Sequence, residues 1–238
     1  MLDHGPLSDA CAKGEILPLY ILEPDLWKQP DVSYRHFLHL QHYLSQLDDM
    51  FTKRGAKLVI KVGEALPVLK SLAARHNVKA IFSHYETWNK FSKDRDSAIR
   101  KWTDENSIDW KEYQQNGVVR NLNSRDGWST LWHSHMRKKI YEVPEKILCV
   151  SEGSDNLPSC QDMSLEFDGF EPNSNLGKIE PGIVLKSFLT ERGENYQREM
   201  SGPLLSADSC SRLSTHIAFG TISIRTIFQR TQEQTQKK

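Results

Sequence analysis

The fold is indicated most directly by residues 57–86, KLVIKVGEALPVLKSLAARHNVKAIFSHYE. Residues 57–63 and 79–86 are short apolar runs of the kind that forms buried strands. Between them a helix is predicted over 64–76, with Pro67 in its first turn, where a missing backbone N–H costs little. A strand, a helix and a second strand in this order predict a parallel β-α-β unit.

The alternation of strand and helix patterns extends to both sides of this unit. Upstream, ILPLYILE is an apolar run bounded by Gly14 and Pro24. Apolar residues then recur at helical spacing between a potential N-cap, Ser33, and Gly55. The further predicted elements are strands over 16–23 and 109–115 and helices over 34–51 and 92–106. This alternation, with short connections, predicts an α/β fold with a parallel doubly wound sheet.

A change of pattern near residue 140 divides the chain. The stretch that follows is rich in Pro, Gly, Ser, Asn and Asp and has little periodicity, which indicates a linker. Helical spacing returns at Pro181, and further helices are expected over 211–219 and after a cap at Thr221 or Ser223. We therefore expect an α/β domain over 1–140, a linker over 141–180 and a helical segment over 181–238.

Composition excludes several classes of protein. The 31 basic and 31 acidic residues balance, so no overall field favours nucleic acid. No apolar run is long enough to span a membrane, and the first residues do not resemble a signal peptide. The four cysteines are far apart and form no C-x-x-C pair, which favours a reduced, cytoplasmic setting and argues against zinc. His133 and His135 are two residues apart and would point to different faces of a helix.

The segment SADSCSRLSTHIAFGTISIR, residues 206–225, gathers polar residues before an apolar run. Asp208, Ser209 and Ser211 are all N-cap residue types, and the free N–H groups of a first helical turn attract anions. From local chemistry alone, plain helix capping is favoured over phosphate binding.

A second segment, residues 116–139, combines two tryptophans with three basic residues at its end. A nucleic-acid patch is one interpretation. A structured loop held by buried Trp side chains is the favoured one.

Taken in order, these segments resemble the cryptochrome/DNA photolyase family, in particular a bacterial branch. ILPLYILEPDLW is similar to the family's second strand, and SRLSTHIAFGTISIR is similar to the S-R-L-S-P-H-L-A-x-G-x-[IL]-S-x-R hallmark of its flavin domain. RNLNSRDGWSTLW and LTERGENYQREMSGP match in type and position. The resemblance covers nearly the whole chain.

The resemblance implies a Rossmann-like antenna domain followed by the start of an all-helical FAD-binding domain. By position, the contacts to the ribityl–phosphate region of the flavin would come from Tyr196, Cys210, Ser211, Leu213 and Ser214. Cys210 stands where a hydroxyl residue is usual, so one phosphate hydrogen bond would be weaker.

The resemblance also implies an antenna chromophore such as a folate. At the expected Asn–Glu pair this chain has Asn89 followed by Lys90, so the usual Glu is absent.

Two departures from the family pattern lead to further expectations. The family's first strand, of the W-F-R-x-D-L-R kind, is missing, and the family continues for about as long again after this chain stops. Loss of a central strand leaves backbone groups unpaired, so association through strand edges is expected. The absent half supplies the flavin ring contacts and most of the DNA-facing groove, so we expect the chain to be inactive in repair.

For a full-length relative the resemblance implies blue-light-driven electron transfer from FAD to pyrimidine dimers in damaged DNA, a lyase reaction that repairs DNA. Two alternatives stay open. One is a cryptochrome that signals blue light without repair, and the other is a remnant that binds only a nucleotide or folate.

Overall fold

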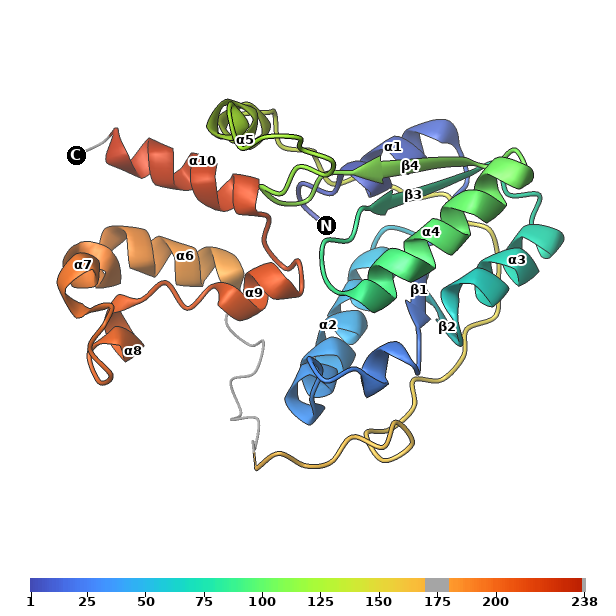
Figure 1. The fold of residues 1–238 in the computed structure, drawn as a ribbon, viewed down its shortest axis with the longest axis horizontal. Coiled ribbons are helices and arrows are strands. Elements are labelled where there is room, and N and C mark those ends of the chain that lie inside the picture. The colour runs from blue at the N-terminus through green and yellow to red at the C-terminus, as the bar shows by residue number, and fades with distance from the viewer. Residues whose placement is uncertain (170–179, 237–238) are drawn as a thin grey trace. The chain divides into compact units, whose positions relative to one another are not determined.

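The computed structural model describes residues 1–169 and 180–236 of the chain, which form two compact units (Figure 1). The first unit contains Asp3–Gln114 and the described residues from Glu142 to 169. The second contains Gln115–Tyr141 and the described residues from 180 to 236. Most of the stretch expected to be a linker therefore belongs to the first unit.

Four short strands of the first unit form two separate parallel sheets. They are β1 (Leu19–Leu22), β2 (Val59–Val62), β3 (Ala80–His84) and β4 (Asp109–Tyr113). β1 pairs with β2, with Leu19 opposite Val59, and β3 pairs with β4, with Ala80 opposite Asp109. The parallel α/β character predicted from the sequence is confirmed, although the strands are shorter than the apolar runs.

Helices connect and flank these strands. They are α1 (Gly5–Lys13), the 3-10 helix η1 (Leu26–Lys28), α2 (Tyr34–Thr52), α3 (Ala65–Arg75) and α4 (Lys90–Glu105). Apart from α1 and η1, each corresponds to a predicted helix within two residues at either end. Helix α1 is not among the predicted helices. It begins after His4, whose Nδ1 accepts a hydrogen bond from the N–H of Leu7 at 3.0 Å.

One apolar cluster joins both sheets to the same helices. Ala65 of α3 and Ile99 and Trp102 of α4 are buried together. Ile21 of β1 and Ile81 of β3 pack against this cluster, as do several other partly buried apolar residues. The two sheets therefore share one core beneath α3 and α4, although no hydrogen bond of the ladder connects them.

Residues 142–169 close the outer edge of β2 without forming a strand. Ser154 Oγ accepts from the N–H of Ile60 at 3.0 Å, and Asp155 Oδ2 accepts from the N–H of Val62 at 2.9 Å. The N–H of Asp155 donates to the Ile60 carbonyl at 2.8 Å. The segment therefore satisfies an edge that would otherwise invite another strand.

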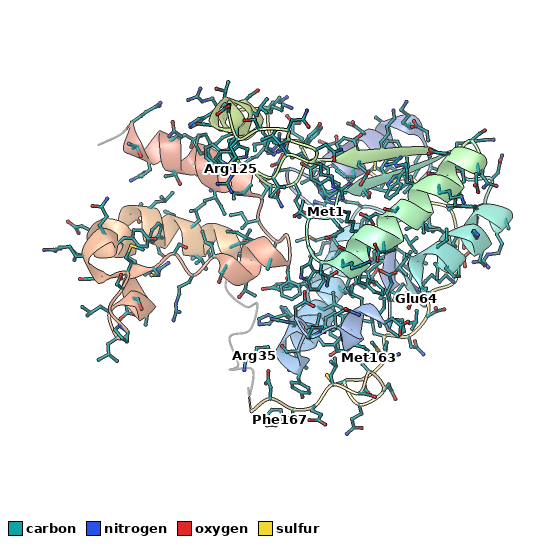
Figure 2. The ribbon with its side chains drawn as sticks, viewed as in Figure 1. Met1, Arg35, Glu64, Arg125, Met163 and Phe167 are labelled. Atoms are coloured by element: carbon teal, nitrogen blue, oxygen red, sulfur yellow. The ribbon has the colours of Figure 1, made fainter. Side chains whose placement is uncertain are left out.

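The far end of this segment is held against α2. Arg35 Nε donates to Asp168 at 2.8 Å, and the rings of Tyr34 and Phe167 meet edge to face with centroids 5.4 Å apart. Figure 2 shows Arg35 and Phe167 on the same side of this unit.

The second unit is helical in its described part. Its elements are α5 (Trp128–Met136), α6 (Pro181–Thr190), η2 (Arg192–Asn195), α7 (Tyr196–Glu199), α8 (Ser206–Ser209), α9 (Ser214–Ala218) and α10 (Ile224–Thr235). The expected cap at Ser223 is confirmed, because its side chain accepts from the N–H of Thr226.

The interpretation of 116–139 as a loop is wrong for the residues that form α5. Trp132 in this helix meets Phe228 of α10 with centroids 5.2 Å apart. Gln229 of α10 donates to the carbonyl oxygens of Met136 and Lys138, each at 2.9 Å. The preceding loop is held by Trp128, whose Nε1 donates to the Gly117 carbonyl at 3.0 Å.

Candidate functional site

The predicted flavin-phosphate residues lie in a tight connection between two short helices of the second unit. α8 ends at Ser209 and α9 begins at Ser214, so residues 210–213 join them. Arg212 in this connection has φ 61°, in the left-handed region that is uncommon for residues other than glycine. We call residues 208–214 the serine loop.

Arg192 of η2 holds the serine loop by its backbone. Its Nη1 donates to the carbonyl oxygens of Asp208 at 3.0 Å and Cys210 at 2.6 Å, and its Nη2 lies 3.4 Å from the Ser211 carbonyl. The same guanidinium binds α6 through Ser187 Oγ at 3.0 Å and the Val184 carbonyl at 3.2 Å. One planar cation therefore joins the loop to α6.

This arrangement determines where the loop's N–H groups point. The C=O and N–H of a trans peptide are antiparallel. Because the carbonyls of Cys210 and Ser211 face Arg192, the N–H groups of Ser211 and Arg212 face away from it. Adjacent N–H groups directed to one side of a loop form a concavity that binds anions.

The side chains of the loop differ in exposure. Leu213 is 3% exposed and anchors the loop, whereas Cys210 and Ser211 are half-buried and Ser214 is exposed. Within the described residues, no hydrogen bond engages the hydroxyls of Ser211 and Ser214. These two hydroxyls are therefore available as donors to a ligand.

Plain capping, which local chemistry favoured, is not what these residues do. The N-cap of α9 is Leu213, and no side chain caps that helix. Ser209 instead donates from Oγ to the Leu205 carbonyl at 3.0 Å, within α8. The expected helix over 211–219 is correspondingly shorter and begins at Ser214.

Tyr196, the remaining predicted flavin contact, is the first residue of α7. Its half-buried ring meets Phe188 edge to face, with centroids 5.6 Å apart. Arg192 lies four residues before it, so the turn that carries Tyr196 is tied to the serine loop. Gly193, which directly follows Arg192, approaches α6 so closely that an added Cβ would lie 2.6 Å from the Phe188 carbonyl oxygen.

The first unit contains a second polar site at the carboxyl end of β1. Glu23, only 3% exposed, accepts from the N–H of Ala65 at 3.0 Å and from Arg95 Nη1 at 2.8 Å. Burial lowers the pKa of Arg95, but hydrogen bonds to Glu23 and Asp96 raise it more, so the guanidinium stays charged. Burial and the neighbouring Glu23 also raise the pKa of Tyr20 above its usual range.

The proposed antenna residues are occupied in local contacts. Asn89 caps α4 by accepting from the N–H of Ser92 at 3.1 Å, and it donates to Asp31. Lys90 forms an exposed ion pair with Asp94. The two side chains thus stabilise the start of α4, and the structure adds no chromophore contact to them.

Sequence reasoning missed Arg192 and the Glu23–Arg95 pair. Arg192 lies in the LTERGENYQREMSGP segment that resembles the family, but its partners in the serine loop are backbone carbonyls, which no sequence pattern reveals. Across residues 1–169 and 180–236 no three His, Cys, Asp or Glu side chains gather to hold a metal ion. In the same residues, every helix is too short or too polar to cross a bilayer.

The fold is thus a doubly wound α/β unit that continues into short helices around a polar loop. The family model for DNA photolyase matches residues 1–127, and the chain belongs to the DNA photolyase family. A curated relative, the chloroplastic/mitochondrial cryptochrome DASH of Arabidopsis thaliana, is 23% identical over 273 aligned positions. That alignment covers 98% of this chain and 45% of the relative, so the chain spans about half the length of the protein it matches.

Solved structures of the same family share the fold. A cryptochrome from Synechocystis matches with a TM-score of 0.79 at 20% identity, covering 100% of this chain and 54% of its own. A class III photolyase from Agrobacterium tumefaciens gives 0.71 at 16% identity, with coverages of 96% and 50%. An archaeal photolyase from Sulfolobus tokodaii, solved with two FAD molecules, gives 0.62 at 24% identity, with coverages of 97% and 52%.

Proposed function

We propose that this chain supplies the antenna domain and the phosphate-binding part of the flavin site in a photolyase or cryptochrome that carries FAD. The observation that carries the proposal is the serine loop. Arg192 holds its carbonyls on one side, and the hydroxyls of Ser211 and Ser214 have no other partner in the described chain. This donor set fits a pyrophosphate, which accepts hydrogen bonds from N–H and O–H groups.

Each predicted residue has a distinct part in holding FAD. Ser211 and Ser214 would donate hydroxyl hydrogen bonds to the phosphates, and the Cys210 thiol would donate a weaker one. Buried Leu213 fixes the loop, and Tyr196 lines the ribityl side by the resemblance. The exposed guanidinium of Arg212 adds positive charge beside the same loop.

FAD, when bound, supplies light absorption and one-electron chemistry. In the whole protein we propose blue-light-driven electron transfer that repairs pyrimidine dimers in DNA, in the cytoplasm. By the resemblance, the residues carried over would contact only the ribityl–phosphate part of such a cofactor, so we propose that the chain of 238 residues lacks repair activity by itself.

Flavin binding is tested on the purified chain by its visible spectrum and by FAD titration. We expect no stoichiometric flavin after purification, but slower amide exchange in residues 206–217 when FAD or pyrophosphate is added. The double variant Ser211→Ala/Ser214→Ala should lose this protection, while Ser201→Ala, an exposed serine outside the loop, should keep it. Flavin bound at one per chain would overturn the proposal that this chain supplies only part of the flavin site. Unchanged amide exchange at saturating FAD would overturn the proposal that the serine loop binds FAD.

Two other functions remain as alternatives. A cryptochrome that signals without repair uses the same FAD site, and an illuminated repair assay on a full-length relative distinguishes it. A protein that binds only a nucleotide or folate is favoured by the buried Glu23–Arg95 pair at the carboxyl end of β1, because doubly wound sheets bind ligands at that edge. Protection of the first unit from proteolysis by folate or ATP, with none by FAD, would support the second alternative.

A further inference from the structure

Residues 151–162 cross the outer edge of β2 between two buried apolar side chains. Ile147 on one side is 1% exposed and Met163 on the other is 8% exposed, so both belong to the core of the first unit. No residue from 151 to 162 is buried, and this stretch forms neither helix nor strand (Figure 1). The hydrophobic effect therefore holds the two ends of the segment but contributes little to its middle. We call residues 151–162 the flap.

The flap meets the backbone of β2 mostly through its side chains. The N–H groups of Ile60 and Val62 donate to Ser154 Oγ at 3.0 Å and Asp155 Oδ2 at 2.9 Å. The N–H of Asp155 adds one backbone bond, to the Ile60 carbonyl at 2.8 Å. A regular ladder would instead repeat backbone bonds along the strand. Because side-chain acceptors can rotate away, the edge is closed by contacts that break without displacing the strand.

Glu152 makes the most strongly charged contacts of the flap. Its Oε1 accepts from Lys61 Nζ at 2.9 Å and from Arg75 Nη2 at 3.1 Å, and its Oε2 lies 2.5 Å from His76 Nε2. The Glu152 side chain is only 10% exposed. Lys61 belongs to β2, whereas Arg75 and His76 lie at the C-terminal end of α3. One carboxylate thus joins the flap to both elements through charge-assisted hydrogen bonds.

The charges around Glu152 make these contacts sensitive to acid and salt. Besides Lys61, Arg75 and His76, an acid also faces this group, because Asp155 Oδ1 lies 3.9 Å from Lys61 Nζ. Hydrogen bonds from His76 and Lys61, with the charge of Arg75, lower the pKa of Glu152 from 4.5 to about 2. The contacts therefore stabilise the closed flap above pH 4.5 and are lost as pH falls toward 2. Salt weakens them as well, since the Debye length falls from about 10 Å at 0.1 M to about 3 Å at 1 M.

We propose that residues 151–162 form an electrostatically held flap, which opens between Ile147 and Met163 while the rest of the first unit stays folded. The open flap exposes the outward N–H groups of Ile60 and Val62. Access to this strand edge then depends on ionic conditions, without unfolding of the core. The device is independent of the serine loop, which belongs to the second unit.

The competing description is a segment that leaves β2 only when the whole unit unfolds. The two descriptions differ in which amides lose protection. Val59 and Gly63 donate to carbonyl oxygens of the segment 18–22, at 2.8 Å and 2.9 Å, so pairing with that segment protects them. Ile60 and Val62 are protected by the flap. A local opening releases the second pair of amides alone, whereas global unfolding releases both pairs.

Amide exchange of the full chain, followed by NMR and expressed as protection factors, distinguishes these cases. We expect 1 M NaCl, compared with 0.1 M, to lower the protection of Ile60 and Val62 about threefold or more. Val59 and Gly63 should change less. Acidification from pH 5 toward 2 should act in the same direction. An equal loss for both pairs of amides would overturn the proposal, and so would no loss at Ile60 and Val62.

A pair of variants tests the role of Glu152. Glu152→Gln cannot carry the charge, so at low salt it should lower the protection of Ile60 and Val62 by about tenfold or more and remove most of their salt dependence. Glu145→Gln is the matched control, because Glu145 is an exposed acid of the same segment outside the flap. Equal protection in the two variants would contradict the proposal. If Glu152→Gln fails to fold, the salt series on the parent chain still decides.

Discussion

Replacement of Arg192 by alanine should release the serine loop while leaving the first unit folded. The side chain donates to three loop carbonyls and also to Ser187 and Val184 of α6, so it is the main polar connection described between the loop and that helix. Arg192→Lys keeps the charge, but an ammonium group cannot span the same set of acceptors, so its effect should be intermediate.

The magnitude follows from the two shorter loop contacts, 3.0 Å to Asp208 and 2.6 Å to Cys210. A hydrogen bond from a charged donor contributes about 1.5–3 kcal/mol, and the lower end applies because the freed carbonyls of this half-buried loop can bind water. The expected loss is about 3 kcal/mol of local stability. Since 1.4 kcal/mol is about a factor of ten, the loop should open roughly a hundred times more often.

Amide exchange across residues 206–217 measures this loss. The informative amides are those of Cys210 and Ile217, which donate to the carbonyls of Ser206 and Leu213. Arg198→Ala is the matched control, because Arg198 is exposed and bonds to Asn195 in its own turn. Equal exchange in Arg192→Ala and in the parent chain would refute the reasoning, and so would an equal effect of the control.

Three further predictions concern the fold around the site. Gly193→Ala should destabilise the second unit by about 1–3 kcal/mol in denaturant titrations, because its Cβ would lie 2.6 Å from the Phe188 carbonyl oxygen. Gly182→Ala, whose Cβ meets nothing within 4 Å, should be neutral or stabilising, and equal losses in both variants would contradict this. Burial lowers the pKa of His4 to about 3, so stability should fall as pH drops from 6.5 toward that value. His4→Asn keeps the helix cap but has no titrating ring, so its melting temperature should not show the His4-dependent fall between pH 6.5 and about 3. A pH profile equal to that of the parent chain would contradict this prediction. Hydrogen bonds from His76 and Lys61 lower the pKa of Glu152 to about 2, so the stability it contributes should be present above pH 4.5 and lost as pH falls toward 2. Glu152→Gln should remove that acid-dependent step from the exchange of residues 152–155, and a step of the same size in the variant would exclude Glu152 as its source.

The part of the fold that the sequence predicted is the part with strong periodicity. α2 was expected over 34–51 and is found at Tyr34–Thr52, because its buried positions Phe37, Leu40 and Leu44 recur at helical spacing. α1 has little such signal, since its buried residues are the adjacent Gly5, Pro6 and Leu7. α5 was missed because tryptophan, histidine and threonine have low helix propensity, and contacts with α10 stabilise it instead.

The candidate site shows the limit of local reasoning more clearly. Asp208, Ser209 and Ser211 have the composition of a helix start, but the backbone at Arg212 is left-handed and the helix begins only at Ser214. The loop carbonyls are instead bound by Arg192, sixteen to nineteen residues earlier in the chain. A pattern of side-chain types carries no information about which backbone carbonyls are bound from a distance.

The division of the chain into its two units has a practical consequence for anyone who wishes to express them separately. Residues 115–141 belong to the helical unit, while 142–169 return to the α/β unit and cover β2 with Ser154 and Asp155. A gene fragment cut at 140 would therefore discard the residues that shield one side of the sheet and retain a helix, α5, without its packing partner α10. An isolated α/β fragment therefore needs both 3–114 and 142–169, and the helical fragment needs 115–141 together with 180–236.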